Sequence, residues 1–349
     1  MNPAVLLVAI TVVVALIFDF LNGFHDAANS IATVVSTRVL SPKLAVVWAE
    51  AFNFLAAFFL GTAVAKTIGH GMIRLDAVDQ YVVLAGLFGA IVWDLLTWWW
   101  GLPTSSSHAL MGGYAGAAMT HEALHAGWRS APSVIIAGGW YKTLLFIVVA
   151  PIMGLILGLA FLTAIYWLLQ HKAPQQVDKW FRKLQLLSAA CYSLGHGGND
   201  AQKTMGIVAG ALYTAGFMSK QDMLGNWGRL HWPIILAAHA AIAAGTYFGG
   251  WRIVHTMGQR ITKLKPVDGF CAESAGAITL FATALAGIPV STTHTITGAI
   301  VGVGAVRRLS AVRWGVATRI VWAWLITIPA SAVMAAATYS LIRIFLRQA

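Results

Sequence analysis

The sequence NGFHDAANS at residues 22–30 decides the organisation of this chain, because a related cassette, GHGGNDAQK, returns at residues 195–203. A second pair follows in the same order, GLPTSSSH at residues 101–108 and GIPVSTTH at residues 287–294. Two motifs that each occur twice in one order predict a duplicated fold. We expect a first repeat at residues 1–170, a cytoplasmic linker at 171–183 and a second repeat at 184–349.

The composition indicates a protein that crosses a membrane many times. Of the 349 residues, 58% are hydrophobic and only 10% are charged. The apolar runs are continuous and rich in Leu, Ala and Val, which favours helices over the alternating strands of a barrel. We therefore predict an all-α polytopic membrane protein with about 10–12 membrane segments. The net charge of +11 comes from short loops between apolar runs, so it predicts membrane topology and no nucleic-acid partner.

The distribution of basic residues predicts that the second repeat is inverted relative to the first. The loop at 121–132 holds one arginine, whereas its counterpart at 305–313 holds three. Loops rich in Lys and Arg usually stay on the cytoplasmic side of a plasma or inner membrane. The equivalent loops therefore lie on opposite sides, and we expect both termini outside. Each repeat should contain a helix broken at the Asp cassette, a full crossing, a hairpin that ends in the Ser/Thr cassette, and a long final helix. Broken helices and hairpins should converge at the membrane midplane.

The two Ser/Thr cassettes predict an anion site. Each follows a Gly-x-Pro sequence and is typical of a helix start, where free N–H groups and hydroxyls attract anions. Ordinary helix capping is the alternative reading. Close helix packing through Gly112, Gly116, Gly298 and Gly302 also fits the pattern. Because both cassettes match in order and spacing, we favour a tetrahedral oxyanion bound by Ser105, Ser106, Ser107, Ser291, Thr292 and Thr293.

The Asp cassettes predict cation or proton sites. Carboxylates are costly in the membrane interior and usually functional there, and Asp26 and Asp200 occupy equivalent positions. Carboxylate and amide oxygens also suit hard cations, so Asn29 and Asn199 join them, with Asp26 and Asp200 as metal ligands if Na⁺ or a divalent cation is used. Helix capping by the carboxylates is the alternative. An anion beside two carboxylates needs positive charge, from cations, from protons or from Lys203. Cation and anion binding should therefore be coupled.

Other polar residues in apolar sequence are weaker candidates. His25 is titratable near neutral pH and could take part in proton coupling. Asn22, His108 and His294 could support the side chains that bind the ions. The two histidines could also donate to the anion, and a purely structural role is the alternative for both. Further carboxylates and a histidine lie at or near membrane depth without a repeated motif, namely Asp19, Glu50, Asp94, Glu273 and His239.

The four cassettes together resemble the signature of the inorganic phosphate transporter (PiT) family of secondary symporters. The resemblance covers nearly the whole chain. It implies symport of inorganic phosphate with cations through two inverted repeats, with Asp26, Asn29, Asn199 and Asp200 at the cation sites and the Ser/Thr cassettes at phosphate. The first cassette has His25-Asp26 where sodium-coupled relatives typically have Asn-Asp. This departure resembles the bacterial low-affinity branch, which uses protons and transports metal-phosphate complexes.

The resemblance favours protons as the coupling ion, and it leaves several alternatives open. Sodium coupling, co-transport of a divalent metal and sulfate as the substrate all remain. An intramembrane hydrolase with Ser105 or Ser107 as nucleophile is disfavoured, because neighbours in sequence rarely have nucleophile–base geometry. A passive channel has no need for paired cation sites. We expect a transporter without enzymatic activity or resident cofactor, whose partners are phosphate, a co-transported cation and the lipid bilayer. The sequence is compatible with a homodimer and does not establish one.

Overall fold

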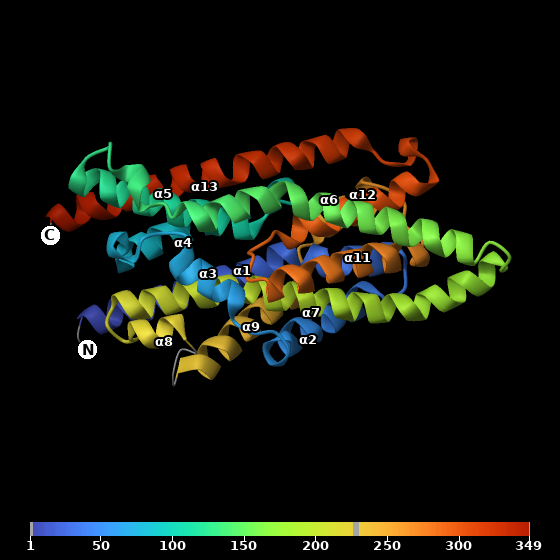
Figure 1. Ribbon diagram of the computed structural model, residues 1–349, viewed down its shortest axis with the longest axis horizontal. Helices are drawn as coiled ribbons and strands as arrows, with labels where there is room; N and C mark the ends of the chain where they lie inside the picture. The colour runs from blue at the N-terminus through green and yellow to red at the C-terminus, as the bar shows by residue number, and fades with distance from the viewer. Residues whose placement is uncertain (1–2, 226–229, 349) are drawn as a thin grey trace.

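The molecule is a bundle of helices aligned along one long axis (Figure 1). The computed structural model describes residues 3–225 and 230–348, and within these ranges it contains no strand, only an isolated bridge between Ile73 and Ile135. The predicted all-α class is therefore confirmed. In chain order the helices are α1 (Pro3–Ser36), α2 (Pro42–Leu55), α3 (Ala63–Gly71), α4 (Gln80–Trp100), α5 (Ser106–Ala126), α6 (Ala137–Leu168), α7 (Pro174–Thr214), α8 (Lys220–Leu224), α9 (His231–Phe248), α10 (Trp251–His255), α11 (Pro266–Leu285), α12 (Thr292–Arg307) and α13 (Trp314–Gln348).

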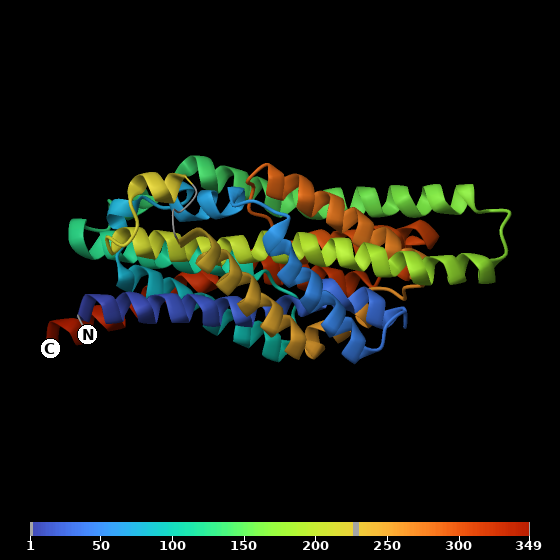
Figure 2. The same cartoon turned by 90° about the horizontal axis from the view of Figure 1, so that it is seen from below.

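Corresponding elements of the two halves run in opposite directions. Helix α1 runs toward the centre from the end that carries both termini, and α7 enters from the other end (Figures 1 and 2). The hairpin formed by α4 and α5 reaches the centre from the terminal end, whereas that of α11 and α12 reaches it from the opposite end. The two hairpin tips meet in the middle of the bundle. The inversion of the repeats stays a prediction, for which these directions are a necessary condition. The hairpins end at the Ser/Thr cassettes as expected.

The two halves are interlocked through glycines. Helix α12 of the second half packs against α6 of the first, and α5 of the first half packs against α13 of the second. A Cβ added at Gly298 would lie 2.1 Å from the Pro151 carbonyl oxygen, and one at Gly116 would lie 2.3 Å from the Ala332 carbonyl oxygen. Only glycine allows backbones to approach this closely. The expected packing role of these glycines is confirmed, and each hairpin is held by the long final helix of the other half.

The positions of the helix breaks differ from the prediction. Both Asp cassettes lie inside continuous helices, because α1 spans 34 residues and α7 spans 41. The breaks occur in the following crossings, where α2 and α3 meet at 78° and α9 meets the segment that begins with α10 at 63°. The cassette glycines serve packing instead of breaking the helix. A Cβ at Gly23 would lie 2.1 Å from the Ile242 carbonyl oxygen, and one at Gly197 would lie 2.5 Å from the Asn53 carbonyl oxygen.

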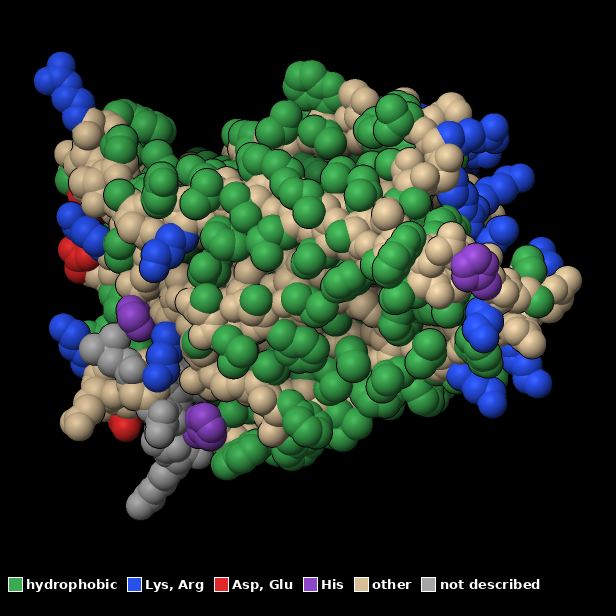
Figure 3. All heavy atoms as spheres, turned by 45° about the vertical axis from the view of Figure 1, so that its right-hand side comes forward, with side chains coloured by type: hydrophobic (Ala, Val, Ile, Leu, Met, Phe, Trp, Pro, Cys, Tyr) green, Lys and Arg blue, Asp and Glu red, His purple; other side chains and the backbone are tan. Residues whose placement is uncertain are grey.

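The outer surface suits a bilayer. Hydrophobic side chains form a broad belt, and Lys and Arg gather at the two ends (Figure 3). Among the described residues, four helices are long and apolar enough to cross a membrane, or six if each bent pair is one span. Helices α5 and α12 lie largely inside the bundle. The predicted number of about 10–12 membrane segments stays a prediction.

Candidate functional site

Asp26 and Asp200 meet at the centre of the bundle. One is on α1 and the other on α7, and both side chains are buried. Their oxygens and a ring nitrogen of His196 all lie within 4.8 Å of one another. Two carboxylates this close in a medium of low dielectric constant repel each other strongly, so a proton or a cation between them is favourable. The sequence predicted the two carboxylates as equivalent, and the structure brings them into one cluster.

The tips of both hairpins reach these carboxylates with their hydroxyl groups. Ser106 donates to Asp26 Oδ1 at 3.4 Å, and Thr293 donates to Asp26 Oδ2 at 3.3 Å. Thr292 donates to Asp200 Oδ2 at 3.1 Å. The Asn29 amide donates to the Thr292 and Thr293 hydroxyls at 3.2 and 2.9 Å. Asp26 is therefore in contact with both hairpins at once.

The first hydroxyl of each cassette is used within its own helix. Ser105 Oγ accepts from the His108 N–H, and Ser291 Oγ accepts from the His294 N–H, both at 3.2 Å. These two serines are the N-caps of α5 and α12. The capping interpretation therefore applies to Ser105 and Ser291. The caps fix the N-terminal turns of both helices at the centre, where their positive dipole ends are available to an anion.

Lys203 joins α7 to both hairpin tips. Its ammonium group pairs with Asp200 Oδ1 at 2.5 Å and donates to the Val290 carbonyl oxygen at 2.7 Å. It also donates to Ser107 Oγ. All three N–H groups therefore have acceptors, although the side chain is buried. An incoming anion would have to replace one of these acceptors to contact Lys203.

His25 connects Asp26 to the first hairpin. Its Nδ1 lies 2.7 Å from Asp26 Oδ1, and its Nε2 lies 3.1 Å from the Thr97 hydroxyl and 3.4 Å from that of Thr104. Both ring nitrogens are therefore engaged, one of them with the central carboxylate. Thr97 was missed in the sequence, because a single threonine in an apolar helix carries no recognisable pattern. Thr104 belongs to the first Ser/Thr cassette but was not among the residues proposed for the site.

His196 is a further residue that the sequence did not single out. Its Nε2 lies 3.4 Å from Asp200 Oδ2, and its Nδ1 lies 3.2 Å from Asn53 Oδ1. Only the continuity of α7 makes this contact predictable, because residues four apart share a helix face. Asn199 donates to the Leu280 carbonyl oxygen at 3.4 Å, and the oxygens of Asn29 and Asn199 have no hydrogen-bond donor among the described residues. These two amide oxygens are available as ligands.

The two cassette histidines hold the hairpins against each other. The rings of His108 and His294 lie 4.7 Å apart, and His294 stacks on Trp324 at 3.8 Å. Trp324 in turn donates to the Pro103 carbonyl oxygen at 3.0 Å. The two histidines lie next to the cassettes but serve the packing of the tips, which supports the structural interpretation of both.

The central cluster offers two kinds of chemistry. Carboxylate, amide and hydroxyl oxygens form a donor set that fits a hard cation such as Na⁺ or a divalent metal. The same region carries two helix N-termini, several hydroxyls and one ammonium group, which favour an oxyanion. The arrangement can therefore hold a cation and an anion next to each other.

Comparison with known proteins agrees with these features. The family model described as "Phosphate transporter family" matches residues 22–335. A probable low-affinity inorganic phosphate transporter of Rhizobium meliloti is 54% identical over 94% of each chain. A protein of the same name from Bacillus subtilis is 39% identical over 97% of this chain and 98% of its own. A solved structure described as "The sodium-dependent phosphate transporter" shares the fold, with a TM-score of 0.85, 24% identity and coverage of 97% of this chain and 99% of that one. The relatives are transporters and not enzymes, and this chain belongs to the phosphate transporter family.

Proposed function

We propose that this protein is a secondary symporter that moves inorganic phosphate into the cell together with cations. The observation that supports this best is the position of Asp26. Its carboxylate accepts hydrogen bonds from the hydroxyl groups of both hairpins, that of Ser106 on one side and that of Thr293 on the other. A group that neutralises Asp26 frees these hydroxyls to donate to a bound anion. The relatives named as probable low-affinity inorganic phosphate transporters support phosphate as that anion.

Phosphate would bind between the N-terminal turns of α5 and α12. We assign the direct contacts to the hydroxyls of Ser106, Ser107, Thr292 and Thr293, whose side chains are buried at the meeting point of the tips. Ser105 and Ser291 would contribute indirectly, by capping the helices and orienting their free N–H groups. Lys203 would contact phosphate by exchanging the Ser107 hydroxyl or the Val290 carbonyl oxygen for a phosphate oxygen.

The co-transported cations would bind at Asp26 and Asp200. Asn29 and Asn199 would add amide oxygens. His25 would exchange a proton with Asp26 through the hydrogen bond between its Nδ1 and Asp26 Oδ1, at 2.7 Å. With cations bound, phosphate no longer faces two uncompensated carboxylates. Each substrate would therefore raise the affinity for the other, and neither would be carried efficiently alone.

We favour protons as the coupling ion because His25, a residue type that can bind and release a proton, is bonded to Asp26. A divalent metal carried with phosphate as a complex fits the same carboxylates. Sodium coupling is the second candidate, supported by the oxygen-rich donor set and by the sodium-dependent phosphate transporter that shares this fold. We propose that both termini face the outside of the inner membrane, since the basic loops at 169–173 and 308–313 lie together at the opposite end of the bundle.

The test is uptake of radioactive phosphate into proteoliposomes that contain the purified full-length protein. One series imposes a proton gradient without sodium, and a second imposes a sodium gradient at equal pH, each with sulfate as a competitor. Uptake driven by the first gradient supports proton coupling, and uptake driven only by the second identifies sodium. The absence of driven phosphate uptake in both series, or stronger uptake of sulfate, would overturn the proposal.

A further inference from the structure

The carboxylate of Asp19 is buried and completes no hydrogen bond with another described residue. Asp19 lies on α1 two helical turns before Asp26, at 0% exposure, and neither of its oxygens completes a hydrogen bond. An ionised carboxylate in such a place costs several kcal/mol unless a positive charge or a donor accompanies it. The central site does not explain why this position holds an acidic residue. In the second half, the residue seven positions before Asp200 is Ser193, so Asp19 is not a product of the duplication.

Two further unpartnered polar groups face Asp19. Asn22 on α1 and Thr204 on α7 both act on its carboxylate. The Asn22 side-chain oxygen and the Thr204 hydroxyl are themselves buried, at 2% and 0% exposure, and have no hydrogen-bond partner within the described ranges. The two Asp19 oxygens, the Asn22 amide oxygen and the Thr204 hydroxyl therefore lie close together on two helices, and none of the four completes a hydrogen bond with another described residue. Oxygen-only donor sets of this kind bind hard cations.

The charges around this position make a cation favourable. Helices α1, α4 and α7 bury four carboxylates, Asp19, Asp26, Asp94 and Asp200, but only one ammonium group, that of Lys203. Lys203 pairs with Asp200 and acts on Asp19 only from a distance. If all four carboxylates are ionised, Lys203 and one cation each at Asp26 and Asp200 still leave one negative charge without a counter-charge. A bound phosphate increases this requirement.

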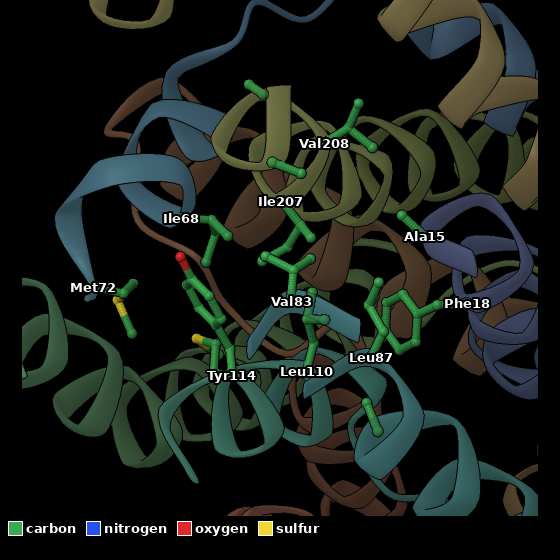
Figure 4. Packing of buried hydrophobic residues seen from close by; sticks show 14 of the residues in the cluster. Ala15, Phe18, Ile68, Met72, Val83, Leu87, Leu110, Tyr114, Ile207 and Val208 are labelled. Atoms are coloured by element: carbon green, nitrogen blue, oxygen red, sulfur yellow. The ribbon is translucent and has the colours of Figure 1, made fainter. Parts of the chain in front are cut away.

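The surroundings of Asp19 exclude water. Phe18, the preceding residue, belongs to an apolar cluster with Leu87 on α4 and Ile207 on α7 (Figure 4). On the other side α1 packs against α9, where the Phe20 carbonyl oxygen would lie 1.9 Å from a Cβ at Gly245. The buried titratable groups on the helices packed against α1 include Asp94 on α4, His196, Asp200 and Lys203 on α7, and His239 on α9, whose Nδ1 is bonded to the Ile235 carbonyl oxygen.

We infer that Asp19, Asn22 and Thr204 form an additional site for a monovalent cation, a proton or Na⁺, which the second half of the molecule does not duplicate. The site lies about 10 Å from Asp26 along α1, toward the end of the bundle that carries the termini. A cation bound there would be carried in addition to those at Asp26 and Asp200. The inference rests on the proposed symport, because it predicts the number of cations moved with each phosphate.

The test compares Asp19→Asn with the unaltered protein in proteoliposomes. Initial rates of phosphate uptake are measured against proton concentration without sodium, and against sodium concentration at fixed pH, together with the charge moved per phosphate. We expect Asp19→Asn to keep phosphate uptake, to move one charge fewer per phosphate and to show a less steep dependence on the ion used. The phosphate concentration for half-maximal uptake at saturating cation should remain unchanged. Asp76→Asn, at an exposed loop position, is the matched control.

The outcomes separate this inference from the proposed function. If the unaltered protein shows no cation-driven uptake, the symport itself fails. If it shows driven uptake and Asp19→Asn moves the same charge per phosphate with the same steepness, the additional site is refuted and Asp19 is structural. Thr204→Val leaves the carboxylate in place and removes one ligand, so it tests the site even where Asp19→Asn does not fold. A raised half-saturating cation concentration with unchanged phosphate dependence supports the site, and an unchanged cation concentration overturns it.

Discussion

The strongest consequence of the central geometry concerns the charge of Asp26. The substitution Asp26→Asn removes one negative charge while it keeps the size of the side chain and an oxygen that can accept from His25. The amide group can donate to the Thr293 hydroxyl, which lies 3.3 Å from Asp26 Oδ2. The loss of one charge also relieves the repulsion between Asp26 and Asp200. We therefore expect the variant to fold and to reach the membrane in normal amounts.

The magnitude of the effect on cation binding follows from Coulomb's law. The ligand atoms of Asp26 and Asp200 lie within 4.8 Å of each other, so a cation bound at either carboxylate lies at a comparable distance from the other. At an effective dielectric constant of about 20, one unit charge at that distance contributes about 3.5 kcal/mol. The loss corresponds to a decrease of roughly 300-fold in cation affinity. Driven phosphate uptake should become undetectable at ordinary cation concentrations.

The assay is gradient-driven uptake of radioactive phosphate into proteoliposomes, with the amount of inserted protein measured in parallel. Asp178→Asn is the control, because Asp178 forms an exposed pair with Arg182 and such pairs contribute little. Uptake by Asp26→Asn within about twofold of the unaltered protein, at equal protein amounts, would refute the electrostatic reasoning, since the expected loss is far larger.

Three further predictions follow from the packing around the site. Gly298→Ala should lower the free energy of unfolding by about 1–3 kcal/mol, since its Cβ would lie 2.1 Å from the Pro151 carbonyl oxygen. Gly138→Ala is the control, because nothing lies within 4 Å of a Cβ there. An equal melting temperature for both variants would contradict this prediction. Lys203→Gln should lower the amount of folded protein, because it leaves the buried Asp200 carboxylate unpaired. The double variant Lys203→Gln/Asp200→Asn should restore folding but not phosphate uptake. Failure of the double variant to fold would argue against the ion pair as the cause. Trp324→Ala should destabilise the protein by about 3–5 kcal/mol in thermal unfolding, because it loses the stacking on His294 and the bond to Pro103, and an unchanged transition would disprove this role.

The sequence predicts the partners of the central site better than the shape of the helices that carry them. Asp26 and Asp200 were recognisable because each sits in a repeated cassette. Their encounter follows from the rule that buried charges face other polar groups. The role of Gly23 could not be predicted in the same way. A glycine within a polar cassette suggests a break, yet here it allows the Ile242 carbonyl oxygen to approach. Close approach of two backbones depends on the tertiary structure and leaves no signal in one chain.

The true breaks carried a weaker local signal. Gly249 has a φ of +66° and ends α9, so the pair Gly249-Gly250 marks the bend before α10. His196 was missed for a related reason. Its contact with Asp200 depends on an unbroken α7, and the expectation of a break at that cassette separated the two residues. One incorrect assumption about backbone continuity therefore accounts for both the misplaced break and the missed contact of His196 with Asp200.

The interlocking of the halves would give the proposed coupling of cation and phosphate a physical basis. Each hairpin is clamped by the long helix of the other half, so neither tip can move without affecting both halves. Asp26 lies between the tips and touches Ser106 on one and Thr293 on the other. In the proposed mechanism, a cation that neutralises Asp26 therefore changes the hydrogen bonds of both hydroxyls that we assign to phosphate at once. By reciprocity, phosphate bound to these hydroxyls must change the affinity of the cation by the same factor. Coupling of this kind needs no separate signal between distant sites, because the two ligands share the same side chains.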